Sequence, residues 1–214
     1  MKALYGCVHY TFKGIFKLLY HHQVYGAQNV FCGAAVIAPN HTSYFDPLFI
    51  CASYPEEVHF MARESLFNKF FLSWIIVKLN AHPVNTDNPS DKTSIKTICK
   101  LLESGEKVVI FPEGVRSTTG ELVPLKFGAS MLALRCHSAV IPVYISGAHD
   151  IWPRDRRYPR LTGRSACVFG SPILWKDFQH LSRKAAQEAM TAKTEESIKT
   201  LREWYQNGAI GTVP

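Results

Sequence analysis

The apolar run Ala-Ala-Val-Ile-Ala at residues 34–38, followed by Asn-His-Thr-Ser-Tyr-Phe-Asp-Pro at residues 40–47, decides the fold we predict. The run has the length and composition of a buried strand. The second segment places His41 five positions before Asp46. Residues five apart on one α-helix point about 140° apart around its axis, so these two side chains cannot meet inside a helix. They can meet if His41 lies in the loop and Asp46 in the first turn of the next helix, with Ser43 as a candidate N-cap.

A histidine held by a carboxylate in this way is suited to act as a general base, because the pKa of imidazole lies near neutrality. The alternative is a capped turn with a surface histidine, and short motifs of this kind often mean no more than that. The rest of the sequence has to decide between the two.

Length and composition indicate one globular domain. The chain has 214 residues and is 47% hydrophobic, which is enough for a substantial core and excludes a disordered chain. Its net charge of +7 favours a negatively charged partner, either nucleic acid, anionic lipid or a phosphorylated substrate. The 6 cysteines show no zinc-ligand spacing and are expected to be reduced thiols of a cytosolic compartment. We find no signal-peptide pattern, and no run reaches the roughly 18 apolar residues of a membrane span.

Residues 2–22 have the pattern of an amphipathic helix that is basic and rich in aromatic residues. The apolar face predicted for it contains Val8, Phe12, Ile15, Phe16 and Leu19. Such a helix can lie in a bilayer interface and attract anionic lipid. Packing on the core of the domain is an equally good interpretation.

Strand and helix patterns alternate along the rest of the chain, which predicts an α/β domain. Strands are expected at residues 34–38, 58–62, 81–84, 107–111, 139–145 and 165–169, and helices at 48–53, 66–79, 91–103, 125–135 and 183–205. Pro142 predicts an irregular or edge position for its strand. We expect a single domain with a central, mostly parallel or mixed sheet of about six or seven strands, flanked by helices.

Two further segments carry candidate binding residues. Pro-Glu-Gly-Val-Arg-Ser at residues 112–117 follows an expected strand, and open α/β sheets bind ligands at the carboxyl ends of strands. A salt bridge within this loop is the alternative. Residues 148–164 contain five arginines with Trp152 and Tyr158, a candidate site for a phosphorylated cofactor, an acidic carrier protein or membrane lipid. A solvated loop is the alternative there, and nucleic acid is supported by charge alone.

Four motifs in this order and spacing resemble the glycerolipid acyltransferases, in particular the bacterial-type 1-acyl-sn-glycerol-3-phosphate acyltransferases. They are the segment at residues 40–47, Phe-Met-Ala-Arg at 60–63, Phe-Pro-Glu-Gly-Val-Arg-Ser at 111–117, and Val-Ile-Pro-Val-Tyr-Ile-Ser-Gly at 140–147. The likeness runs from about Ala34 to Gly147. It implies a glycerol-3-phosphate acyltransferase-like fold. It also implies transfer of a fatty acyl group from an acyl-CoA or acyl carrier protein thioester to lysophosphatidate, giving phosphatidate in phospholipid biosynthesis.

The resemblance also assigns roles to residues. His41 matches the catalytic base of the family and Asp46 its orienting carboxylate. The acceptor-binding loop is matched by Glu113, Gly114 and Arg116, and phosphate contact by Arg63 and Lys126. No metal and no cofactor are implied beyond the thioester co-substrate. We expect a peripheral enzyme at the cytoplasmic face of a membrane, with residues 1–30 as the membrane-associating segment and 31–214 as the acyltransferase domain.

The chemistry of the residues agrees with direct transfer. The chain has no Gly-x-Ser-x-Gly elbow, so direct transfer without an acyl-enzyme is the simpler interpretation. Backbone amides near the His41 turn are the expected oxyanion donors.

One departure from the family concerns the acceptor. Thr86 stands where the family usually has an arginine tied to the phosphate of the acceptor. Another lysophospholipid or glycerol 3-phosphate is therefore an alternative acceptor. The alternative of another class is a non-catalytic lipid-surface protein, which would need neither His41 nor Asp46.

Overall fold

One mixed sheet organises the computed structural model, which describes residues 3–29, 31–68, 73, 76–84 and 92–214. Its strands follow the order β1-β7-β6-β2-β5-β3-β4, and all neighbours are parallel except β6 and β7. The strands are β1 (Gln23–Tyr25), β2 (Ala35–Pro39), β3 (Val58–Arg63), β4 (Ala81–Val84), β5 (Lys107–Val109), β6 (Ala139–Ser146) and β7 (Ala166–Phe169). The predicted α/β class and strand number are confirmed, with seven strands in the sheet.

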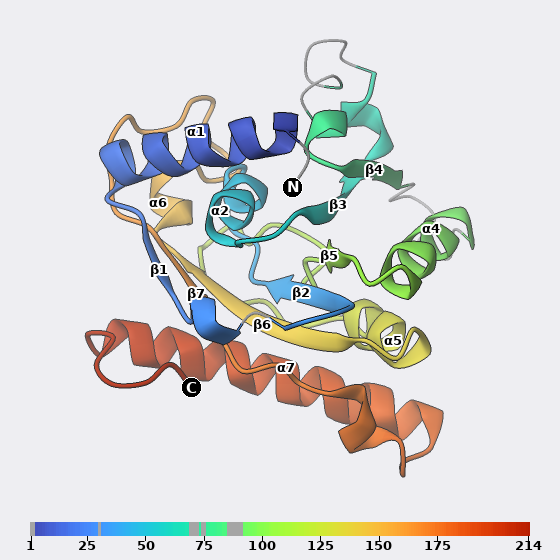
Figure 1. The fold of residues 1–214 in the computed structure, drawn as a ribbon. Helices are drawn as coiled ribbons and strands as arrows, with labels where there is room; N and C mark the ends of the chain where they lie inside the picture. Colours follow the sequence, from blue (N-terminus) through green and yellow to red (C-terminus); the bar gives the residue numbers. More distant parts are fainter. Residues whose placement is uncertain (1–2, 30, 69–72, 74–75, 85–91) are drawn as a thin grey trace.

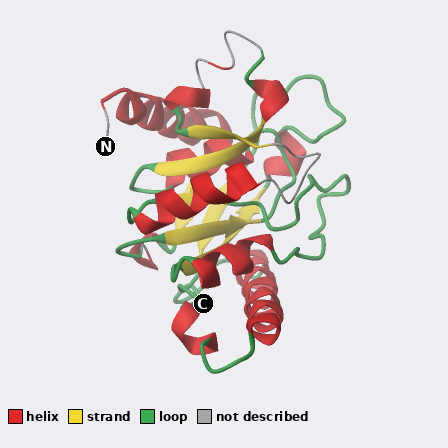
Figure 2. Cartoon of the chain, turned by 90° about the vertical axis from the view of Figure 1, so that its right-hand side faces the viewer, coloured by secondary structure: helices red, strands yellow, loops and turns green. Residues whose placement is uncertain are grey.

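Helices cover both faces of this sheet (Figures 1 and 2). The described helices are α1 (Ala3–Tyr20), α2 (Asp46–Ser53), α4 (Lys92–Glu103), α5 (Gly128–Arg135), α6 (Ala148–Ile151) and α7 (Arg183–Gln206), with short 3-10 turns at η1 (Ala27–Asn29), η2 (Glu64–Leu66) and η3 (Trp175–Phe178). Alternate residues of β2 face two separate cores. Ile37 packs in the core with α1 and α2, whereas Val36 packs in the core with α4, α5 and α7. A strand covered on both sides is apolar throughout, which explains the run that predicted it.

The expected helix at 66–79 is described only in part. Its first residue, Leu66, ends η2, and residues 76–78 are helical. Residues 69–72 and 74–75 lie outside the described residues. The three-residue strand β1 was not predicted, because its place is set by pairing with β7, far along the chain.

We predicted an irregular or edge position for Pro142: the edge position is wrong, because its strand is interior, but the pairing on one side is irregular there. β6 pairs with β2 on one side and β7 on the other. The carbonyl of Pro142 accepts from the amide of Gly170 at 2.9 Å, so the missing N–H of the proline faces the same neighbour. The β7 ladder ends one pair earlier, at Val143 and Phe169. The proline is tolerated because the neighbouring strand has already left the ladder there.

The helix α1 packs on the core with most of the face that we predicted, and Ile15 is the exception. Tyr5, Phe16 and Tyr20 are buried, and Val8, Phe12 and Leu19 pack partly against the same core. Ile15, which we placed on the buried face, is exposed. Among the described residues, α1 included, we find no helix with the length and apolar character needed to cross a membrane.

The parallel strands β2, β5 and β3 end at one edge of the sheet. His41 follows β2, Glu113 follows β5, and Arg63 is the last residue of β3. Because carboxyl ends of parallel strands share an edge, the fold gathers these candidate residues on one side of the molecule.

Candidate active site

The predicted contact between His41 and Asp46 is present. The Nδ1 atom of His41 lies 2.8 Å from Oδ2 of Asp46. Asp46 is fully buried in the first turn of α2, and the side chain of His41 is 18% exposed. With Nδ1–H donated to the carboxylate, Nε2 is left as the basic nitrogen of the ring. The ring also stacks on Phe111, with centroids 3.9 Å apart, so its plane is fixed from two directions.

Backbone amides of the turn converge on the carboxylate of Asp46. The amides of Thr42 and Ser43 each donate to Oδ2 at 2.7 Å. All of these contacts fall on Oδ2, which they hold firmly, whereas Oδ1 is buried and has no hydrogen-bond partner among the described residues. The turn is therefore built around this one side chain.

One detail of the turn differs from the sequence prediction. Ser43 is not the N-cap: α2 begins at Asp46 with Phe45 as its cap residue and no side-chain cap bond. Pro47, in the first turn, removes one amide that a cap would satisfy. The amides of Thr42 and Ser43 donate to Asp46 and that of Tyr44 donates to the carbonyl of Trp152, so these three are already engaged, and oxyanion donors among backbone amides near the turn stay a prediction.

Glu113 is directed at the backbone of the turn. Its Oε1 accepts from the amide of His41 at 3.0 Å, and the residue is only 1% exposed. The same two segments are joined again where the amide of Ser117 donates to the carbonyl of His41 at 2.8 Å. The loop after β5 thus fastens the residue whose side chain Asp46 orients. The other oxygen, Oε2, is buried and has no hydrogen-bond partner among the described residues, and acceptor contact by Glu113 stays a prediction.

Burial raises the pKa of the Glu113 carboxyl from 4.5 to about 7. The nearby charge of Asp46 raises it further, while the amides of His41 and Val123 oppose the shift. Glu113 therefore changes charge close to neutral pH.

Arg116 lies across the aromatic ring of Tyr44. Its guanidinium carbon is 3.7 Å from the ring centroid, a cation–π contact that holds the side chain beside the His41 turn. Nη1 of Arg116 is buried and has no hydrogen-bond partner among the described residues. A guanidinium with an unused donor is suited to bind an anionic oxygen.

Gly114 allows a second cation to approach the same loop. The residue has φ of +72°, a conformation that favours glycine. A Cβ added there would meet the side chain of Lys126, including Nζ at 3.0 Å. Lys126 and Gly114 are therefore in contact, as a shared role in phosphate binding requires.

Two candidate positions remain, Arg63 and Thr86. Arg63 is exposed at the end of β3, on the same edge of the sheet as His41 but separated by β5. Thr86 lies outside the described residues. Phosphate contact by Arg63 stays a prediction.

Asn40 and Phe111 belong to the sequence motifs, but the sequence alone assigned them no role. Asn40 bonds both backbone groups of Ile145, accepting from the amide at 2.7 Å and donating to the carbonyl at 3.2 Å. This pins the end of β2 to β6. Phe111 supplies the ring on which His41 stacks. Asn40 directly precedes His41, and Phe111 lies close before Glu113 in the sequence. Their closeness to predicted site residues was the only feature of the sequence that pointed to them.

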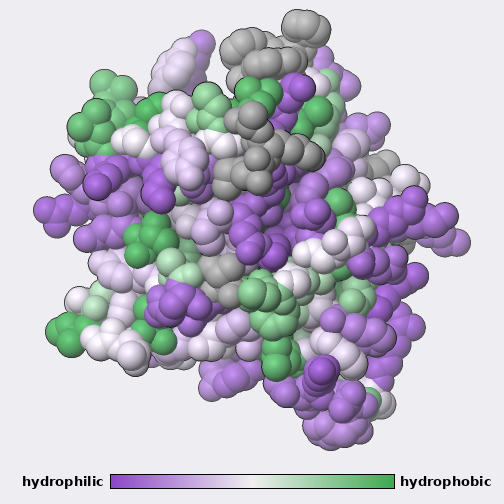
Figure 3. All heavy atoms as spheres, viewed as in Figure 1, coloured by the Kyte–Doolittle hydropathy of each residue, from purple (hydrophilic) through white to green (hydrophobic). Residues whose placement is uncertain are grey.

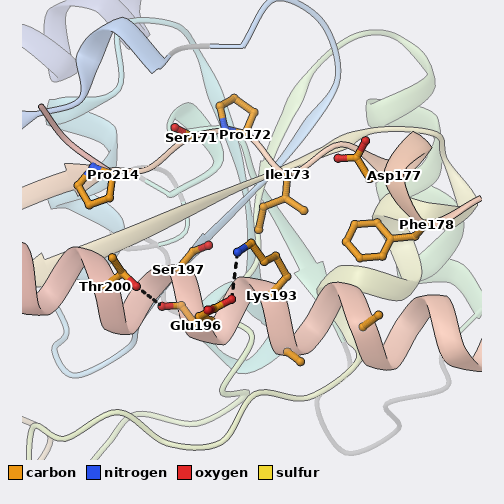
Figure 4. A pocket seen from close by; sticks show the side chains of 12 residues that line it. Ser171, Pro172, Ile173, Asp177, Phe178, Lys193, Glu196, Ser197, Thr200 and Pro214 are labelled. Carbon is orange, nitrogen blue, oxygen red and sulfur yellow. Dashed lines mark hydrogen bonds and ion pairs between the residues drawn. The ribbon is translucent and has the colours of Figure 1, made fainter.

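A groove of about 880 Å³ lies elsewhere, between α7 and residues 171–178 (Figure 4). It holds the ion pair of Lys193 with Glu196, at 3.0 Å, and none of the candidate residues lines it. Within the described part of the chain, no cluster of three or more histidine, cysteine, aspartate or glutamate residues could hold a metal ion.

The chain is similar to known proteins in sequence and in fold. A family model described as Acyltransferase matches residues 21–146. The chain is 34% identical over 181 residues to the 1-acyl-sn-glycerol-3-phosphate acyltransferase of Bacillus subtilis, covering 84% of this chain and 87% of that protein. It is 29% identical to the enzyme of that name from Streptococcus pneumoniae, over 69% of this chain and 52% of the relative. The crystal structure of the 1-acyl-sn-glycerophosphate (LPA) acyltransferase PlsC from Thermotoga maritima has the same fold, with a TM-score of 0.67 at 24% identity, over 92% of this chain and 83% of that one.

Proposed function

We infer that this chain, which belongs to the acyltransferase family and is an acyltransferase, transfers a fatty acyl group from a thioester to 1-acyl-sn-glycerol 3-phosphate. The product is phosphatidate. The observation that carries the proposal is the contact of the partly exposed His41 ring with the buried carboxylate of Asp46, beside the guanidinium of Arg116. The resemblance of the motifs and the names of the relatives support the same acceptor.

His41 acts as the general base in this proposal. The acceptor hydroxyl gives its proton to Nε2 of His41 while its oxygen attacks the thioester carbonyl. As the new C–O bond forms and the C–S bond breaks, the imidazolium returns the proton to the leaving thiolate. Asp46 holds the ring in the required tautomer and stabilises the imidazolium. Positioned general-base catalysis contributes about 10²–10⁴-fold in rate.

Arg116 and Lys126 bind the phosphate of the acceptor in this proposal. Both are cations of the segment that joins β5 to α5, with Gly114 in contact with Lys126 and Tyr44 supporting Arg116. Glu113 acts through the backbone of His41, as a positioning residue. The loop after β5 therefore has two roles in this proposal: it carries the anion-binding cations, and through Glu113 it positions the base, which lies in the turn after β2.

The acyl donor is a thioester of coenzyme A or acyl carrier protein, and the proposal requires no separate cofactor or metal. We place the enzyme as a peripheral protein at the cytoplasmic face of a membrane. Residues 1–30 form the membrane-associating segment and residues 31–214 the acyltransferase domain.

A second acceptor class is favoured by one feature of the sequence. Thr86 replaces the arginine that the resemblance ties to the phosphate, so another lysophospholipid or glycerol 3-phosphate is the alternative acceptor. A non-catalytic lipid-surface protein would have no use for a buried carboxylate that orients a histidine.

An acceptor panel tests the proposal. Purified protein is given a labelled acyl thioester with lysophosphatidate, glycerol 3-phosphate or other lysolipids, and the His41→Ala variant serves as the control. We expect the highest kcat/KM with lysophosphatidate and none above background for the variant. Preference for a lysolipid without the phosphate monoester would overturn the acceptor assignment. Equal turnover by the variant would overturn the mechanism.

A further inference from the structure

The outer face of α1 exposes large apolar side chains. Leu18 is 76% exposed and Tyr10 is 68% exposed, although the opposite face of the helix packs in the core. Lys13 and Lys17 are exposed on the same helix, and α1 contains no acidic residue. A helix that is already packed on one side and remains apolar and basic on the other is suited to contact a further partner.

Residues 153–164, which we call the arginine loop, are fastened to the end of this helix. The hydroxyl of Tyr20 donates to the carbonyl of Arg160 at 2.8 Å, and the amide of Gly163 donates to the carbonyl of Leu19 at 3.2 Å. Figure 1 shows the loop running beside the carboxyl end of α1. Because the backbone is held in this way, the loop and α1 form one continuous surface.

The arginine loop repeats the character of α1. Leu161 is 79% exposed and Tyr158 is 65% exposed. The loop contains five arginines and one acidic residue, Asp155. Its exposed arginines are Arg154, Arg157, Arg160 and Arg164. In Figure 3 hydrophobic and hydrophilic residues lie side by side over this part of the molecule.

Trp152 connects this surface to the active site. Its carbonyl accepts from Oγ of Ser43 at 2.8 Å and from the amide of Tyr44 at 3.3 Å, and its ring packs on Phe45 with centroids 4.8 Å apart. Tyr44 in turn supports the guanidinium of Arg116. The residue that precedes the arginine loop is thus only one side chain away from the proposed phosphate-binding arginine.

We propose that the exposed face of α1 and the arginine loop form one docking surface for an anionic bilayer. This inference rests on the proposed function and deepens it, because the surface adjoins, through Trp152 and Tyr44, the arginine that we propose binds the acceptor phosphate. Arginines attract the anionic headgroups, while the exposed leucine and tyrosine side chains enter the interface. Charge alone, as an acidic protein partner would offer, gives no reason for the exposure of Leu18 and Leu161.

Vesicle flotation tests the electrostatic half of this surface. The variant Arg154→Gln/Arg157→Gln/Arg160→Gln is compared with wild type on vesicles of phosphatidylcholine containing phosphatidylglycerol, and on pure phosphatidylcholine. Each basic residue near an anionic leaflet contributes about fivefold in binding, so we expect a loss of roughly 100-fold on the anionic vesicles. The matched control is Lys176→Gln/Arg183→Gln/Lys184→Gln, three exposed cations near α7 on the opposite face of the sheet. We expect the control to float like wild type.

The apolar half is tested with Leu18→Ser/Leu161→Ser. We expect this variant to bind both kinds of vesicle more weakly, because it loses apolar contact with the bilayer and keeps the charge. Anionic-vesicle binding by the arginine variant equal to that of wild type would overturn the proposal. So would unchanged vesicle binding together with lost binding of acyl carrier protein, since the loop would then be a protein-docking surface.

Measured rates of acyl transfer distinguish a failure of the docking surface from a failure of the proposed function. With a short-chain lysophosphatidate that stays monomeric in water, we expect the arginine variant to react at the wild-type rate, because docking is not needed. If the arginine variant loses as much activity with this monomeric acceptor as with lysophosphatidate in vesicles, a docking role is contradicted. If wild type acylates neither acceptor, the proposed function fails, and the flotation result still decides the docking surface.

Discussion

The His41 turn, residues 40–45, and the arginine loop are joined through Trp152, yet they use polar groups in opposite ways. In the turn, the amides of Thr42 and Ser43 and the ring of His41 all meet one buried carboxylate. In the loop, the backbone is held on α1 and the charged side chains extend into solvent. The difference shows that one edge of the sheet carries a rigid site for chemistry and, beside it, a charged surface for binding a large partner. Each prediction below changes one residue on the active-site side of this comparison.

After the loss of His41 itself, the largest effect is expected from Asp46→Asn. Asparagine keeps an acceptor for the amides of Thr42 and Ser43 but removes the charge that stabilises the imidazolium. We expect kcat to fall by about 10³–10⁴-fold with the fold retained. Steady-state kinetics and thermal melting of the purified variant check this. A variant that melts normally and retains kcat within tenfold of wild type would show that the carboxylate only shapes the turn.

Glu113→Gln is expected to change how stability depends on pH. The pKa of the folded carboxyl is raised to about 7, so the folded state keeps a proton that the unfolded chain releases near pH 4.5. The stability linked to that proton is fully present below pH 4.5 and is lost as the pH rises through 7. Its magnitude is on the order of 3 kcal/mol.

Denaturant unfolding of wild type and Glu113→Gln between pH 4.5 and 8 measures this difference. We expect wild type to lose stability relative to the variant across that range. A difference that is independent of pH would mean that Glu113 does not titrate there.

Arg116→Ala is expected to raise the acceptor KM by about 10–100-fold, the contribution of a charge-assisted hydrogen bond to phosphate. The KM of the acyl donor should not change. Arg135→Ala, an exposed arginine at the end of α5, is the matched control. Initial-rate kinetics with each substrate varied in turn decide the question, and an effect confined to the donor would move Arg116 out of the acceptor site.

The smallest effect is expected from Tyr44→Leu, which removes the ring beneath Arg116. A cation–π contact at a partly exposed site is worth about 0.5–1 kcal/mol, so the acceptor KM should rise about two- to fivefold. Tyr44→Phe keeps the ring and should behave like wild type. If both variants raise KM equally, the hydroxyl matters and the ring does not.

Local patterns predicted the parts of the fold that local physics determines. The apolar run of β2 reflects a strand covered on both faces, and the five-residue spacing correctly brought His41 to Asp46. Contacts between distant segments had no local signal. Asn40 reaches Ile145 across 105 positions, and Ser43 reaches Trp152 across 109. The contact of Glu113 with the amide of His41, 72 positions away, had no local signal for the same reason.

The central claim is that the imidazole of His41 takes the proton of the acceptor hydroxyl. The most direct measurement is the rate of acyl transfer from a labelled thioester to lysophosphatidate by purified His41→Ala, with folding verified by its melting curve. We predict a folded protein with no transfer above the uncatalysed rate. Transfer at a rate close to that of wild type would contradict the claim.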